Sequence, residues 1–157
     1  MVSDGVHSFS DYVHLAQQHI EFESVCHIYD QISHVSQTGV LVSTNCVVTA
    51  AHGVVSLLKT RNQSLKTEDT FPVHQLILTF STRFGNKRVR SKAVKVDWRY
   101  LTPSWGEEAK YDFAWIELDE SITDIQPARL FEQQSISQDA LLTVVTWSMA
   151  DQRSRDH

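Results

Sequence analysis

The chain has 157 residues, 41% hydrophobic and 21% charged, a composition typical of one globular domain rather than of a disordered chain. Its formal net charge of −5 argues against nucleic acid and anionic membrane surfaces as partners. No apolar run reaches the roughly 20 residues of a membrane-spanning helix, and residues 1–7 lack the basic and then apolar pattern of a secretory signal. Two cysteines are too few for a disulfide framework, so the sequence leaves the cellular compartment open.

The first predicted elements are an N-terminal helix and a series of short strands. Ser10 and Asp11 can cap a helix whose apolar stripe contains Val13, Ala16 and Ile20. The segments that follow are rich in β-branched residues and are separated by polar turns, which predicts strands at 25–29, 39–42 and 46–49.

The second half of the strand pattern contains one helical interruption. Residues 53–58 favour one or two helical turns, and residues 59–70 form a charged loop. Further strands are predicted at 71–80, 88–98 and 111–118. Residues 84–87 predict a hairpin turn, and the apolar alternation slips by one near Ala93 and Val94, as a β-bulge requires. Many short strands with little helix predict an all-β barrel or sandwich.

The most informative segment is Thr38-Gly-Val-Leu-Val-Ser-Thr-Asn-Cys-Val-Val-Thr-Ala-Ala-His52. It predicts a strand, a short turn and a second strand that delivers a histidine. The small residues Ala50 and Ala51 allow the backbone to turn closely at the end of the second strand, beside the histidine. The whole pattern is far more specific than a lone histidine.

A second segment, Tyr111-Asp-Phe-Ala-Trp-Ile-Glu-Leu118, completes the pattern. Together the two segments resemble the T-A-A-H and D-I-A-L-L-x-L motifs of trypsin-like serine peptidases. Residues 125–130 resemble the segment that leaves the first barrel of that family, and residues 142–147 resemble the first strand of its second barrel. The resemblance covers roughly residues 24–148.

The resemblance implies an all-β fold: a six-stranded antiparallel Greek-key barrel of trypsin-like type, with an incomplete second barrel. It divides the chain into an N-terminal extension (1–23), the first barrel (24–134), and a crossover with the first strand of a truncated second barrel (135–157). It also implies that His52 is the general base and Asp112 the carboxylate that orients it.

Departures from the family are as informative as the matches. Gln37 and Gly53 stand where the family has a disulfide around the histidine loop, so Cys26 and Cys46 are expected to be free thiols in strands. No I-V-G-G-like activation segment occurs, and neither a G-D-S-G nor a G-x-S-x-G nucleophile segment is present. Cys46, only six residues before His52 and within a strand, serves better as packing than as a nucleophile.

The remaining polar patterns point to no further cofactor or ligand. The eight histidines form neither H-E-x-x-H nor any other metal-ligand spacing, so no metal and no cofactor are expected. The short basic run fits the solvated face of a hairpin rather than a nucleic-acid site: Lys87, Arg88, Arg90 and Lys92.

The functional expectation is a trypsin-like serine endopeptidase that, as these 157 residues alone, is inactive because it has no nucleophilic serine. Two interpretations stay open: the N-terminal part of a longer peptidase, or a pseudo-peptidase module that binds a protein or peptide through the barrel face. The strand at 141–147 lacks its pairing strands, so a homodimer or a strand-swapped oligomer is also expected.

Overall fold

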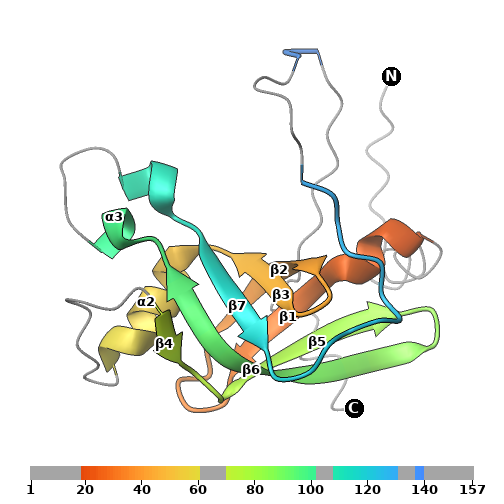
Figure 1. Cartoon of the computed structure of the whole chain (residues 1–157), viewed down its shortest axis with the longest axis horizontal. Helices are drawn as coiled ribbons and strands as arrows, with labels where there is room; N and C mark the ends of the chain where they lie inside the picture. Colours follow the sequence, from red (N-terminus) through yellow and green to blue (C-terminus); the bar gives the residue numbers. More distant parts are fainter. Residues whose placement is uncertain (1–18, 61–69, 102–107, 131–136, 140–157) are drawn as a thin grey trace, which may run out of the picture.

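The computed structural model describes residues 19–60, 70–101, 108–130 and 137–139 (Figure 1). Most of the expected N-terminal helix and all of the expected first strand of a second barrel lie outside these residues. Within them, no helix is long and apolar enough to cross a membrane.

The described residues form one antiparallel sheet that closes into a barrel. The strands are β1 (Val25–Asp30), β2 (Ser36–Ser43), β3 (Cys46–Thr49), β4 (Thr70–Pro72), β5 (Leu76–Thr82), β6 (Gly85–Val96) and β7 (Ala114–Leu118). Their order is β4-β6-β5-β1-β2-β3-β7, and β7 also pairs with β6. That last pairing joins six of the strands into a closed ring, with β4 as an addition beside β6. The predicted six-stranded antiparallel barrel is therefore confirmed.

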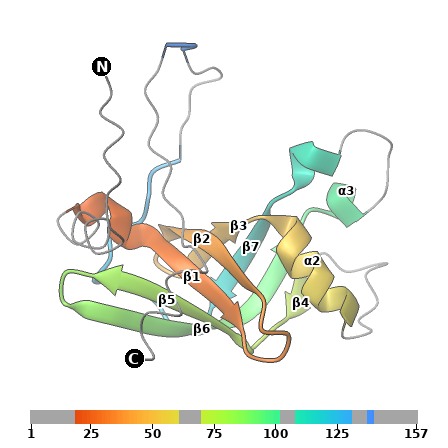
Figure 2. The same ribbon diagram turned by 180° about the vertical axis from the view of Figure 1, so that it is seen from behind.

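The helices are short and lie outside the ring of strands. They are η1 (Ile20–Ser24), α2 (Ala51–Thr60), α3 (Trp98–Leu101) and η2 (Glu108–Tyr111). Figures 1 and 2 show α2 and α3 at one end of the barrel, away from the turn that joins β5 to β6. The expected helical turns at 53–58 are thus part of a longer helix, which begins next to the histidine.

The core fills the inside of the barrel mainly through alternation. Along β1, Cys26, Ile28 and Asp30 are buried while the residues between them are partly exposed. β7 alternates in the same way, and β5 does so except at Thr79, which is buried as well, so period-two patterning in sequence becomes one continuous interior. The largest fully buried side chains are Phe80, Ile28, Leu41, Leu76, Leu78, Ile116, Ile122, Val47, Val54, Val94 and Val96.

Strand β6 contains the predicted bulge. Its register against β7 shifts between Ser91 and Ala93, and the buried positions change from Val89 and Ser91 to Val94 and Val96. The slip in the apolar alternation was therefore a correct signal. The bulge lets one long strand pair with β5, β4 and β7 while the barrel curves around it.

Several expected boundaries were wrong. The strand predicted over 111–118 begins only at Ala114, and the strand predicted to end at residue 98 ends at Val96. The single strand predicted over 71–80 is divided into β4 and β5, because Ser91 interrupts it: the Ser91 hydroxyl donates to the Val73 carbonyl at 2.6 Å and accepts the Leu76 N–H at 3.3 Å. The hairpin turn consists of Arg83 and Phe84, earlier than expected, and Gly85 begins β6 with a φ of 116°. Only glycine adopts that backbone angle readily.

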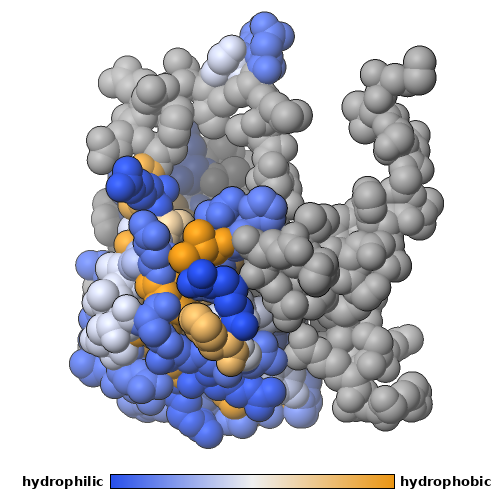
Figure 3. Space-filling view, turned by 90° about the vertical axis from the view of Figure 1, so that its right-hand side faces the viewer, coloured by the Kyte–Doolittle hydropathy of each residue, from blue (hydrophilic) through white to orange (hydrophobic). Residues whose placement is uncertain are grey.

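A segment after β7 covers one opening of the barrel. Ile122 and Ile125 are buried, and the Ile122 N–H donates to the Thr44 carbonyl at 2.6 Å. The Ala128 N–H donates to the Leu41 carbonyl at 2.8 Å, so this segment follows the β2–β3 hairpin. The face of the molecule in Figure 3 is mostly hydrophilic, with small hydrophobic spots among the described residues.

Candidate active site

Strand pairing places the two candidate residues side by side. β3 ends at Thr49, which pairs with Ala114 at the start of β7. Continuing this antiparallel register by two residues brings Ala51 opposite Asp112. The 60-residue separation in sequence between His52 and Asp112 is therefore closed by the β3–β7 pairing, and their contact does not depend on a flexible loop.

Asp112 makes a two-pronged contact with His52. Its Oδ2 lies 2.8 Å from the Nδ1 of the imidazole, and its Oδ1 accepts the backbone N–H of His52, also at 2.8 Å. The Ala51 N–H donates to the same carboxylate. Asp112 thus caps the N-terminus of α2 and orients the ring at the same time. The predicted hydrogen-bond contact between these two side chains is present.

The charge state of Asp112 follows from these contacts. Burial of the carboxyl, the largest single effect, raises its pKa. The hydrogen bonds from the His52 ring and backbone, the charge of His52 and the Ala51 N–H together outweigh burial, so the pKa of Asp112 lies below its usual value. An ionised Asp112 favours the imidazole form that carries its proton on Nδ1 and leaves Nε2 as a base.

The exposure of the pair suits proton transfer with a ligand. The side chain of His52 is 69% exposed, while that of Asp112 is 29% exposed. The carboxylate is thus shielded behind the imidazole, and the imidazole faces outward. Asp112 sits at the middle of a tight turn in which the Phe113 N–H donates to the Tyr111 carbonyl at 2.8 Å.

The segment directly before His52 is fixed by a hydrogen bond to β2 and by core packing. The Thr49 hydroxyl donates to the Thr38 carbonyl at 2.7 Å, which ties the end of β3 to β2. Ala51 is completely buried, and Val54 in the first turn of α2 is almost completely buried. A larger side chain at residue 51 would have to displace the core, which explains the small residue directly before the histidine.

A comparison with known protein families assigns the chain to a family. The Trypsin family model matches residues 15–155, nearly the whole chain. The chain belongs to the trypsin family. A search of curated proteins found no match.

This trypsin-family chain has no disulfide between the positions flanking its histidine, as expected. Gln37 and Gly53 are nevertheless neighbours: a Cβ built on Gly53 would lie 1.9 Å from the Gln37 Oε1. Both cysteines are free and lie in strands, which confirms the expectation. Burial raises the pKa of Cys26, and burial together with the Glu117 carboxylate raises the pKa of Cys46. Neither environment favours the thiolate that a cysteine nucleophile needs.

Sequence reasoning missed a polar cluster on the approach to Asp112. The Arg99 guanidinium lies 4.1 Å from the centre of the Tyr111 ring and contacts both carboxylate oxygens of Asp97, at 2.8 and 2.7 Å. This cluster links α3 to η2, which leads directly into the turn that carries Asp112. Asp97 and Arg99 are only two apart, but nothing in their spacing pointed to Tyr111.

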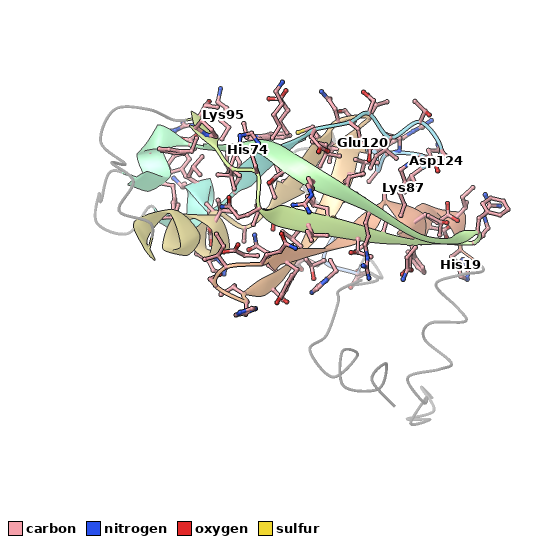
Figure 4. The ribbon with its side chains drawn as sticks, turned by 90° about the horizontal axis from the view of Figure 1, so that it is seen from below. His19, His74, Lys87, Lys95, Glu120 and Asp124 are labelled. Atoms are coloured by element: carbon pink, nitrogen blue, oxygen red, sulfur yellow. The ribbon has the colours of Figure 1, made fainter. Side chains whose placement is uncertain are left out.

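Other charged side chains on the barrel surface form ion pairs away from His52. Lys87 and Asp124 lie together in Figure 4, with Nζ and Oδ1 3.0 Å apart, and Lys92 lies 2.9 Å from Glu117. Part of the basic run on β6 is therefore neutralised by neighbouring carboxylates. Among the described residues, no group of three or more histidine, cysteine, aspartate or glutamate side chains could hold a metal ion.

Proposed function

We propose that His52 and Asp112 form the proton-transfer half of a trypsin-type serine endopeptidase site. The observation that carries the proposal is the two-pronged contact of Asp112 with the backbone N–H and the Nδ1 of His52, both at 2.8 Å. A carboxylate that only capped the helix would not need to meet the ring as well. One that also orients the ring leaves Nε2 directed away from the protein as a base.

In this role each residue has a defined task. His52 Nε2 accepts the proton of the nucleophile's hydroxyl as that oxygen attacks the peptide carbonyl, and later donates it to the leaving amine. Asp112 stays ionised, holds the proton on Nδ1 and stabilises the imidazolium that forms. Its lowered pKa supports this task because the carboxylate keeps its charge at neutral pH.

The nucleophile is not among the 157 residues in a recognisable segment, since neither G-D-S-G nor G-x-S-x-G occurs. Removal of the nucleophile from a triad costs about 10⁶-fold in turnover. These residues alone are therefore proposed to be inactive as an endopeptidase. Full activity would require a serine supplied by a further segment of a longer polypeptide.

A fluorophosphonate probe, which labels activated serines, tests this proposal. The 157-residue chain is expected to give no labelling. If the coding sequence continues into a G-D-S-G-G segment, the longer product is expected to be labelled, and His52→Ala should abolish labelling. Asp112→Asn should reduce turnover by about 10⁴-fold, the loss known for the corresponding change in a trypsin triad. Labelling that survives His52→Ala in the longer product would contradict the assignment of the base.

The second candidate is a pseudo-peptidase module that binds a protein or peptide through the barrel face carrying His52. The observation that favours it is that the first barrel closes by itself, through β6 and β7. A stable, monodisperse chain of 157 residues, with no continuing reading frame for a serine segment, would support this candidate over the first.

A further inference from the structure

We infer that Gln37 is a positioning residue for His52, acting through Gly53. The inference rests on the proposed function, because it concerns the orientation of the base. Gln37 lies on β2 in the same alternating set as Gly39 and Leu41, which are buried. The end of its side chain lies against Gly53 of α2. Gly53 directly follows His52 in the first turn of that helix.

The end of the Gln37 side chain occupies the space that a side chain at position 53 would need. An ideal Cβ on Gly53 would lie 1.9 Å from Oε1 and 2.9 Å from Cδ of Gln37. Both distances are shorter than real Cβ contacts, so either the amide or the helix would have to move. Glycine is also an unfavourable residue within a helix, which indicates that the close contact, and not helix propensity, selects it here.

The Gln37 amide is held there despite an unfavourable environment. Its Nε2 is buried and has no hydrogen-bond partner among the described residues. Leaving a buried donor unpaired opposes folding. Local arrangements that oppose folding are typical of functional sites, and this one lies against the residue next to His52.

Two consecutive β2 residues hold the histidine segment from both sides. The Thr38 carbonyl accepts the Thr49 hydroxyl at 2.7 Å before the histidine, and the Gln37 side chain packs on Gly53 after it. Between them, Asp112 accepts the His52 N–H and faces Nδ1. Because the imidazole itself is 69% exposed, protein packing contributes little to its orientation. The position of the backbone at residue 52 therefore decides whether the ring meets Asp112.

The test is the NMR signal of the His52 Nδ1–H in the ¹⁵N-labelled 157-residue chain, assigned by its absence in His52→Ala. Gly53→Ala is expected to abolish this signal or to speed its exchange with water at least about tenfold, because the new Cβ displaces the Gln37 amide from its contact with α2. Gln37→Met keeps the shape of the side chain without the unpaired amide, and it should retain the signal. Leu78→Val, a destabilising change in β5 remote from the site, should also retain it.

The outcomes separate the inference from the proposed function. Asp112→Asn should remove the signal if the His52–Asp112 pair exists in solution; a signal that survives this change would refute the pair itself. If Asp112→Asn removes the signal but Gly53→Ala leaves it unchanged, only the positioning role is overturned. Should Gly53→Ala fail to fold, Gln37→Ala replaces it: faster exchange supports the inference, and wild-type exchange overturns it.

Discussion

The two contacts of Asp112 can be separated by comparing Asp112→Ala with Asp112→Asn. Alanine removes both carboxylate oxygens, so α2 loses its cap and the His52 ring loses its acceptor. Asparagine keeps one oxygen that accepts the hydrogen bond of the His52 backbone N–H, but its NH₂ group cannot accept a hydrogen bond from the Nδ1–H of the ring. The first change therefore removes helix capping and ring orientation, and the second removes mainly ring orientation.

The size of each effect follows from the geometry. Loss of an N-terminal cap costs about 1 kcal/mol of unfolding free energy. The contact with the ring contributes about 1 kcal/mol, below the usual range for a charge-assisted hydrogen bond because His52 is 69% exposed. We therefore expect Asp112→Ala to destabilise the chain by about 2 kcal/mol, and Asp112→Asn by about 1 kcal/mol, since the cap is kept.

Urea unfolding at pH 7 measures this difference. With a slope of about 2 kcal/mol per molar urea, Asp112→Ala should lower the midpoint by about 1 M and Asp112→Asn by about 0.5 M. Equal losses for the two variants would show that capping by residue 112 contributes nothing. An alanine variant within about 0.5 kcal/mol of the wild type would refute both contacts in solution.

The pH dependence of the same pair has a defined sign. The pKa of Asp112 is lower in the folded chain than in the unfolded chain, so its contribution to stability is complete above the unfolded value of about 3.9. That contribution is lost as the pH falls through the folded pKa. The stability gap between wild type and Asp112→Asn should therefore shrink as the pH falls below about 4; a gap that grows in this acidic range would reverse the assignment.

Three further predictions concern other parts of the chain. The double variant Gln37→Cys/Gly53→Cys should form a disulfide on oxidation and gain about 3 kcal/mol, as expected for a loop of this length; failure to cross-link would contradict the contact between these residues. Thiol titration of the denatured, unreduced wild type should count two free thiols, and a count of zero would contradict the free cysteines. In the native chain, Cys46 should react only slowly and Cys26 not at all. We propose, from the sequence, that the chain associates through its apolar segment at residues 141–147. The double variant Val144→Asp/Trp147→Ser should then raise the monomer fraction measured by light scattering. A wild-type chain that is already monomeric when dilute, and that these changes leave unaltered, would contradict this association.

Much of the barrel was predictable because its signals are local. Alternating apolar residues, such as Cys26 and Ile28 in β1, show which side of a strand is buried without knowledge of its partner. The bulge was predictable for the same reason, since it appears as a slip in that alternation. The candidate pair, His52 and Asp112, was found through two motifs whose letters are contiguous in the chain.

Sequence patterns alone therefore indicated most of the strands, their buried faces and the two segments that carry His52 and Asp112. Three contacts become visible only in the folded chain: Ser91 divides β4 from β5, Asp112 caps α2, and Gln37 packs on Gly53. Each of these contacts joins residues at least fifteen apart in the chain. Such contacts form only when the barrel closes. The apolar periodicity of one strand shows which of its faces is buried, but it does not show which residues of other strands it will contact.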